Sequence, residues 1–393
     1  MISLFINAPA ASAGGGLTYL RNVLPQLARR HDAKCTVLLS RNLRREFPEN
    51  QNISFVEIPE SWNALRRFSY EQTALPAMIR RSGAQVLIST GNFALWNSPV
   101  PQILLSRNSL YTSGDFARDV RARGDYAIWF DTVVKGWLAR SSITRAEVTI
   151  APSEAFAREL SHWSGRQVVA IHHGFDPDAF TSDETALPDG VQSHLEDGKD
   201  ALRLLFVSHY NYYRNFETLL RAMPLMNRLL KARKAKLYLT CRLNSRENPG
   251  NYEAESASSL LSEVRGVGDI VELGSLPYRS LHHLYRACHI YVTAAYAESF
   301  AHPLVEAMSS GLPVVASDLL VHREICGGAA VYFPAFSSGE LAIAIARLET
   351  DQELATTLSQ AGRARARDFS WEQHVARLLE VAARLTPAEI SNT

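Results

Sequence analysis

Residues 298–318 read ESFAHPLVEAMSSGLPVVASD and place two carboxylates, Glu298 and Glu306, among mostly apolar or small residues. Pro303 fits the first turn of a helix but would break a helix interior, so Glu298 is expected in a loop and Glu306 in the first turn of the helix that follows. Backbone N–H groups between the two carboxylates, and those of the new helix, suit an anion such as phosphate. The alternative is that both carboxylates lie on a solvated face.

The same pattern of a helix followed by a β-branched strand extends in both directions along the chain. Alternation of short apolar runs with helical periodicity is typical of βα units around a parallel sheet, so the fold class is α/β. The clearest helix covers 18–31, with apolar residues at i, i+3, i+4 and i+7. The expected strands are 2–7, 35–40, 53–58, 85–90, 102–106, 147–152 and 168–173, then 202–208, 236–241, 269–274, 289–294, 313–317 and 329–333.

The length of 393 residues indicates two domains of roughly 150–200 residues each. Residues 181–200 interrupt the periodicity with Pro, Gly and acidic residues, which is typical of a linker. We expect one Rossmann-like domain at 1–180, a second at 201–368, and a helix within 369–393 that packs back on the first domain. Ligands of open parallel sheets bind beyond the carboxyl ends of the strands, so two such doubly wound domains would face a central cleft.

Composition excludes several functional classes. Forty-one basic residues nearly balance forty acidic ones, which gives no reason to expect a nucleic-acid partner. The four cysteines have no metal-binding spacing and suggest reduced, buried thiols, as in a cytoplasmic protein. The first residues lack the basic segment of a signal peptide, and no apolar stretch approaches the roughly 18–20 residues that span a bilayer.

Two further features lie where a sheet-edge ligand would bind. The triplet Gly14, Gly15 and Gly16 falls between the first strand and the first helix, where glycines let backbone amides approach a phosphate, although such turns also simply connect elements. It matches neither the dinucleotide fingerprint nor the P-loop. Arg214 follows the first strand of the second half and could neutralise a diphosphate; taken alone, a solvated surface arginine is the simpler interpretation.

From about residue 200 to 370, the sequence resembles the donor domain of retaining glycosyltransferases of family 4, which have the GT-B fold. Glu298 and Glu306 match the family's E-x7-E motif, followed by a Gly-x-Pro-Val segment at 311–314. The segments 202–208, 278–292 and 369–381 also match its pattern. The first half matches more loosely, as acceptor domains of this family do, through the glycine triplet, 152–160 and 171–180. The resemblance thus implies that 1–180 binds the acceptor and 201–368 binds the donor.

The resemblance implies a role for each matched residue. Glu306 would bind ribose hydroxyls of the nucleotide, Glu298 would reach the transferred sugar, and Arg214 would hold the diphosphate. A front-face mechanism with retention follows, in which cation and amide dipoles stabilise the leaving diphosphate, so that neither a metal nor another cofactor is expected. The remaining donor-binding candidates are Ser299, Phe300, Ala301, His209, Gly15 and Gly16.

The chain departs from the family pattern at two places. Ser208 and His209 stand where the family commonly has Gly-Arg, so one cation on the diphosphate is replaced by a side chain whose charge depends on pH. Arg107 and Asn108 follow strand 102–106 where the family often has a histidine, and both are candidate acceptor-side residues. His172 and His173 precede Gly174 and suit a structural or hinge role.

The predicted function is therefore a hexosyltransferase that uses a nucleotide-sugar donor and a glycan or lipid-linked acceptor, as in cell-surface polysaccharide or lipopolysaccharide biosynthesis. Alternatives are a nucleotide-sugar-binding protein with degenerate catalysis and a nucleotide-sugar epimerase of the same fold. Basic residues also suggest an anionic membrane surface as a partner at the inner face of the membrane, although charge runs are usually solvated faces. They are Arg41, Arg44 and Arg45, Arg66 and Arg67 beside Trp62 and Phe68, and Arg80 and Arg81.

Overall fold

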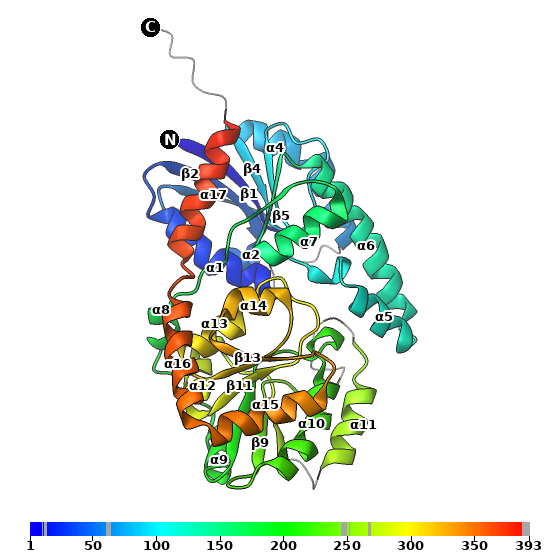
Figure 1. The fold of residues 1–393 in the computed structure, drawn as a ribbon. Helices are drawn as coiled ribbons and strands as arrows, with labels where there is room; N and C mark the ends of the chain where they lie inside the picture. The colour runs from blue at the N-terminus through cyan, green and yellow to red at the C-terminus, as the bar shows by residue number, and fades with distance from the viewer. Residues whose placement is uncertain are drawn as a thin grey trace. The chain divides into compact units, whose positions relative to one another are not determined.

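The computed structural model describes residues 1–9, 11, 14–59, 64–244, 250, 252–265 and 269–386; Trp62 of the basic clusters lies outside these ranges. The chain divides into two compact units. Unit 1 comprises 1–112, 127–174 and 370–393, and unit 2 comprises 113–126 and 175–369. Each unit is a parallel sheet with helices packed against it (Figure 1).

Unit 1 is built on a seven-stranded parallel sheet in the order β3-β2-β1-β4-β5-β6-β7. Its strands are β1 (Ile2–Asn7), β2 (Ala33–Ser40), β3 (Ile53–Ile58), β4 (Val86–Ser89), β5 (Gln102–Leu105), β6 (Val148–Ala151) and β7 (Val168–Ala170). Its helices are α1 (Gly14–Ala28), α2 (Arg41–Arg44), α3 (Ala64–Thr73), α4 (Leu75–Ser82), η1 (Ser109–Tyr111), α6 (Tyr126–Arg145, whose first residue belongs to unit 2), α7 (Glu154–Ser164) and α17 (Trp371–Leu385).

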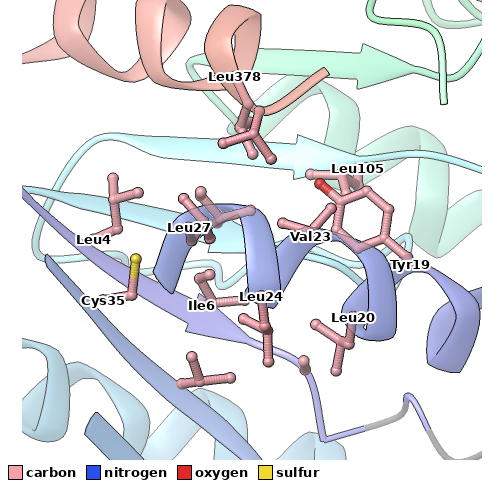
Figure 2. Close-up of a cluster of buried hydrophobic side chains, with 14 of the residues drawn as sticks. Leu4, Ile6, Tyr19, Leu20, Val23, Leu24, Leu27, Cys35, Leu105 and Leu378 are labelled. Atoms are coloured by element: carbon pink, nitrogen blue, oxygen red, sulfur yellow. The ribbon is translucent and has the colours of Figure 1, made fainter. Parts of the chain in front are cut away.

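The core of unit 1 is shared by its sheet, its first helix and its last helix. α1 contributes Val23 and Leu27, and α17 contributes Val375 and Leu378, all buried in one cluster. Figure 2 shows these three sources of side chains together, with Leu4 from β1. The spacing of apolar residues in both helices matches a 3.6-residue period, so each presents one apolar stripe to the strands. The C-terminal helix is therefore part of the first unit's core.

Unit 2 has a six-stranded parallel sheet in the order β10-β9-β8-β11-β12-β13. Its strands are β8 (Leu202–Phe206), β9 (Ala235–Leu239), β10 (Asp269–Glu272), β11 (Ile290–Thr293), β12 (Val314–Ser317) and β13 (Ala330–Phe333). Its helices are α5 (Gly114–Ala122), α8 (Pro177–Thr181), α9 (Asp189–Asp197), η2 (Tyr212–Arg214), α10 (Phe216–Leu229), α11 (Glu255–Val264), η3 (Tyr278–Ser280), α12 (Leu281–Ala287), α13 (His302–Ser309), α14 (Leu320–Cys326), α15 (Ser338–Thr350) and α16 (Gln352–Ala366).

The boundary between the units differs in place from the expected linker. The chain leaves unit 1 after Gly174 and returns at Ser370, and residues 189–197 of the expected linker form the helix α9. A side chain at Gly174 would lie 2.0 Å from the backbone nitrogen of Trp371, so glycine allows these two crossing segments to touch. Pro, Gly and acidic residues marked 181–200 as irregular, although they also suit the start and the end of a short helix.

None of the helices in the described ranges is long and apolar enough to cross a membrane.

Segment 113–126 belongs to unit 2 although the sequence places it in the first half of the chain. Arg123 explains this assignment, because its guanidinium pairs with Glu217 of α10 at 2.8 Å and with Asp119 of α5 at 3.0 Å. The hydroxyl of Tyr296, beyond β11, donates to Asp119 at 2.6 Å. The hydroxyl of Tyr212 in η2 donates to Asp125 at 3.0 Å. These charges tie α5 to α10 and to two loops of unit 2.

We predict that Arg123→Met lowers the free energy of unfolding by about 3–5 kcal/mol, because it leaves the buried carboxylate of Glu217 without its cation. Urea denaturation followed by circular dichroism measures this loss. Arg118→Met is the matched control, since Arg118 pairs with Asp115 on an exposed surface and should change stability by less than about 1 kcal/mol. Adding Glu217→Gln to Arg123→Met should restore part of the loss, and equal stability of Arg123→Met and the unmodified chain would contradict this account.

Candidate active site

The sheet of unit 2 reverses its strand order between β8 and β11. Open parallel sheets bind ligands at such a switch point, beyond the carboxyl ends of the strands. The loop after β8 leads into η2, and the loop after β11 leads into α13. Two hydrogen bonds hold these loops together: Tyr296 N–H donates to the carbonyl of Tyr213 at 2.9 Å, and the Asn215 side chain donates to the carbonyl of Ala294 at 3.0 Å.

Arg214 and Glu298 form an ion pair across this switch point. Arg214 ends η2, where the Asn211 side chain accepts a hydrogen bond from its backbone N–H at 3.1 Å. Glu298 stands in the loop after β11, as expected, and its side chain is only 9% exposed. The structure therefore brings together the two residues that the resemblance assigned to the diphosphate and the transferred sugar.

Glu306 lies in the second turn of α13, rather than in the first turn as the sequence suggested, because the helix begins at His302. Its carboxylate is buried and accepts a hydrogen bond from Tyr285 at 2.8 Å. Burial raises the pKa of Glu306 to about 7, although hydrogen bonds from Tyr285 and Tyr278 oppose this shift. The sequence argument missed both tyrosines, because their contact with Glu306 depends on how η3 and α12 pack against α13.

The loop between the two glutamates contains Ser299, Phe300 and Ala301. Ala301 has a φ of +66°, which is unusual for a residue with a side chain and costs about 1–2 kcal/mol. The ring of Phe300 is buried and packs edge-on against Phe369, which fixes the loop in this conformation. The loop is thus rigid and strained immediately before the start of α13, a combination that recurs at binding sites.

His209 follows β8 and is exposed to solvent. Desolvation of its ring by neighbouring atoms and the positive charge of Arg214 lower the pKa of His209 below its ordinary value. A histidine with a lowered pKa is mostly neutral near pH 7, so it donates or accepts a hydrogen bond there without adding a full positive charge. Near pH 7, the positive charge at this edge is therefore carried mainly by Arg214.

His322 is a buried residue near this edge that the sequence argument missed. Its Nδ1 donates to the carbonyl of Ser317 at the end of β12 at 2.9 Å, and burial lowers the pKa of His322 to about 4. Among the residues that the structure describes, its Nε2 and the Nε of Arg214 are buried nitrogens without a hydrogen-bond partner. The only sequence signal was a histidine placed shortly after a strand that ends at this edge.

The other predicted site residues belong to unit 1. Gly15 and Gly16 lie in the first turn of α1 rather than in a separate loop, and a side chain on Gly16 would come within 3.2 Å of Ala11. Arg107 donates to the carbonyls of Gly15 at 2.9 Å and Thr90 at 2.6 Å. Its guanidinium also lies 5.1 Å from the centre of the Tyr19 ring. Arg107 therefore fastens the glycine turn to the edge of the sheet.

Asn108 accepts a hydrogen bond from Leu110 N–H at 3.0 Å and caps η1. The two histidines before Gly174 contribute to the packing of α17. The carbonyl of His172 accepts a hydrogen bond from Nδ1 of His374 at 2.8 Å, and the ring of His173 packs against Trp371. Tyr19 completes this cluster by donating to Nε2 of His374 at 3.0 Å.

We predict that the pKa of Glu306 makes stability depend on pH. The pKa is raised in the folded chain, so the native state binds the proton more readily, and this contribution is complete below about pH 4.5 and lost as the pH rises through about 7. Between these values, the free energy of unfolding should fall by up to about 3 kcal/mol relative to that of Glu306→Gln. Urea denaturation across this range tests it, with the exposed Glu340→Gln as control; parallel pH profiles for the unmodified chain and Glu306→Gln would contradict it.

Comparison with known proteins identifies the family. Residues 13–179 match the family model "Glycosyltransferase Family 4", and residues 192–365 match "Glycosyl transferases group 1". A segment of 105 residues, 27% of this chain, is 32% identical to the O-antigen chain mannosyltransferase B of Escherichia coli, and covers 28% of that protein. Another segment of 236 residues, 58% of this chain, is 25% identical to a D-inositol 3-phosphate glycosyltransferase of Kribbella flavida, and covers 54% of it. The chain thus spans about half or less of the length of these curated relatives.

The fold is shared with solved structures. A sucrose-phosphate synthase from Thermosynechococcus elongatus superposes with a TM-score of 0.75 at 18% identity, over 98% of this chain and 99% of that one. The expected pair of Rossmann-like domains in a GT-B fold is confirmed. With two family models that together match most of its residues, the chain belongs to the family 4 glycosyltransferases, and its second half is a glycosyl transferases group 1 domain.

Proposed function

We propose that this chain is a retaining hexosyltransferase that moves a hexose from a nucleotide diphosphate sugar to a glycan or a lipid-linked saccharide. The ion pair of Arg214 with Glu298 at the switch point of unit 2 is the observation that carries the proposal. Similarity to an O-antigen chain mannosyltransferase supports an acceptor of the kind used in cell-surface polysaccharide or lipopolysaccharide biosynthesis.

The proposed reaction gives each side chain a distinct task. Ribose hydroxyls donate to Glu306, whose position Tyr285 fixes. The diphosphate replaces Glu298 as the partner of the Arg214 guanidinium, and Glu298 then accepts hydrogen bonds from hydroxyls of the hexose. In the bound state, Arg214 is therefore paired with the diphosphate and the carboxylate of Glu298 with hydroxyls, so neither buried charge lacks a partner.

Transfer then proceeds on one face of the sugar. The bond from the anomeric carbon to the diphosphate oxygen breaks while the acceptor hydroxyl attacks from the same side, and the hydroxyl proton passes to the departing diphosphate. Arg214 stabilises the charge that develops on that diphosphate, aided by N–H groups of the 299–301 loop and by a hydrogen bond from neutral His209. Because these groups stabilise the negative charge on the leaving diphosphate, the proposal includes no metal and no other cofactor.

A thermal-shift screen of UDP, GDP, ADP and their hexose conjugates tests the donor site. One nucleotide family should raise the melting temperature, since a ligand that binds the folded state stabilises it, and Glu306→Ala should abolish the shift. Glu298→Gln should keep nucleotide binding and lose about a hundredfold or more in transfer rate. Glu340→Gln is the exposed control. Unchanged turnover in Glu298→Gln, or no stabilisation by any nucleotide, would overturn the proposal.

The proposal includes contact with an anionic membrane surface at the cytoplasmic face, where a lipid-linked acceptor would be presented. Two of the basic residues first considered are paired with acidic residues, Arg41 with Glu57 and Arg44 with Glu49. Helix α6 provides a stronger candidate surface, an exposed apolar stripe on one helical face. The α6 stripe consists of Tyr126, Phe130, Val133, Val134 and Trp137. Aromatic residues of this kind favour the membrane interface, and exposed Arg140, one turn beyond Trp137, adds attraction to anionic lipid.

Replacing Phe130 and Trp137 with serine should weaken binding to vesicles of phosphatidylglycerol and phosphatidylcholine by about tenfold or more, because two large apolar side chains no longer enter the interface. Vesicle flotation measures the bound fraction. Ile343→Ser, at an exposed apolar residue of unit 2, is the control. Absence of binding by the unmodified chain at low salt, or equal binding by the unmodified chain and the double variant, would count against membrane contact.

A further inference from the structure

Asn7 ends β1 at the switch point of the unit 1 sheet, where the strand order reverses between β1 and β4. Its side chain is 6% exposed. Within the described ranges, its Oδ1 has no hydrogen-bond partner. A buried carbonyl oxygen without a partner costs about 1–3 kcal/mol, and such an atom at a ligand-binding edge is a reason to expect a donor from outside the chain.

Glu71 is a charged partner of Asn7. It belongs to α3, and its carboxylate is hydrogen-bonded to the Asn7 side chain. Gln72, the next residue, fixes this helix by accepting from Trp96 N–H at 2.9 Å and donating to the carbonyl of Ala94 at 3.3 Å. Burial raises the pKa of Glu71 to about 7, against the opposing charge of Arg67. A half-buried carboxylate is thus held in place at the carboxyl edge of the sheet.

Arg107 joins the same edge through Thr90. The hydroxyl of Thr90 donates to the backbone carbonyl of Asn7 at 3.0 Å, and Nη2 of Arg107 donates to the backbone carbonyl of Thr90 at 2.6 Å. Two of its guanidinium nitrogens are therefore occupied by backbone carbonyls. Its Nε is buried and, in the part of the chain that the structure describes, has no hydrogen-bond partner.

Of the described side chains discussed above, three offer a group to a ligand at this edge, two of them acceptors and one a donor. The acceptors are the carboxylate of Glu71 and Oδ1 of Asn7, and the donor is Nε–H of Arg107. A hydroxyl both donates and accepts, so neighbouring hydroxyls on a sugar ring can satisfy all three groups. A phosphate monoester carries at most one proton near pH 7, too few to donate to both acceptors, and its negative charge would be repelled by the carboxylate of Glu71. The chemistry favours a neutral saccharide over an anion.

We propose that Asn7, Glu71 and Arg107 form the subsite that binds neighbouring hydroxyls of the acceptor saccharide. The inference rests on the proposed glycosyl transfer and assigns its acceptor side to residues that the sequence argument did not select, apart from Arg107. Asn108 is not part of this proposal, since its side-chain oxygen already accepts from Leu110 N–H.

Binding of methyl α-glycosides of mannose, glucose and galactose, measured by ligand-observed NMR, tests the subsite without a known acceptor. The unmodified chain should bind at least one of them, and Glu71→Ala should weaken that binding by about tenfold or more, because a hydrogen bond to a charged group is lost. Glu57→Ala, on β3 of the same sheet and exposed, should bind like the unmodified chain. Asn7→Ala should weaken binding in the same direction, and a melting temperature recorded for each variant verifies folding.

Equal affinity in Glu71→Ala, or no binding of any glycoside to the unmodified chain, overturns the subsite. The nucleotide thermal shift, recorded on the same variants, separates this failure from failure of the proposed function. A nucleotide shift that persists while no glycoside binds removes the subsite alone. Glycoside binding that depends on Glu71, without any nucleotide shift, supports the subsite and removes the glycosyl transfer on which its acceptor role rests.

Discussion

Parallel pairing of β8 with β11 is the constraint on which the candidate active site depends. Parallel strands need crossover connections, so the carboxyl ends of all strands meet at one edge, and the reversal of order between these two leaves their loops side by side. Arg214 and Glu298 come from those two loops and lie far apart in the sequence. Their ion pair follows from sheet topology, and the Tyr296 to Tyr213 hydrogen bond then fixes the loops to each other.

One buried carboxyl group and one strained backbone position at this edge lower stability rather than raise it. Glu306 is buried with tyrosine hydroxyls as partners and no cation in hydrogen-bond contact among the described residues, and its raised pKa measures what that burial costs. Ala301, in the loop immediately before α13, adds backbone strain. The edge of the sheet persists in this state because the surrounding strands, buried on both faces, supply the apolar packing that opposes these costs. Backbone strain and buried charge close together are expected at a binding site, where a bound ligand provides the hydrogen bonds that the free protein lacks.

The sequence was sufficient to predict features that depend on local periodicity, and on the rule that ligands of open parallel sheets bind beyond the carboxyl ends of the strands. Every expected strand is present, with each end within three residues of the expected one. The proximity of Arg214 to Glu298 follows once both are assigned to loops after neighbouring strands. Contacts between helices were not predictable in this way. Tyr285 reaches Glu306 through the rotation of α12 about its axis, which periodicity leaves open. Segment 113–126 follows β5 in the sequence, yet its charges are paired in unit 2, and no local pattern indicates a partner so distant in the chain.

Both sheets have a switch point where the strand order reverses, but the side chains at the two switch points differ in charge. In unit 2, the switch point presents a guanidinium and a histidine beside two carboxylates, a set that suits a ligand with both phosphates and hydroxyls. In unit 1, the corresponding edge presents a carboxylate and an amide oxygen, and most of the guanidinium of Arg107 is already used by backbone carbonyls. Arg214 can exchange its carboxylate partner for a diphosphate, whereas Arg107 donates to two backbone carbonyls and keeps only Nε–H for a ligand. In the proposed reaction, this difference favours the nucleotide sugar on unit 2 and a neutral acceptor on unit 1.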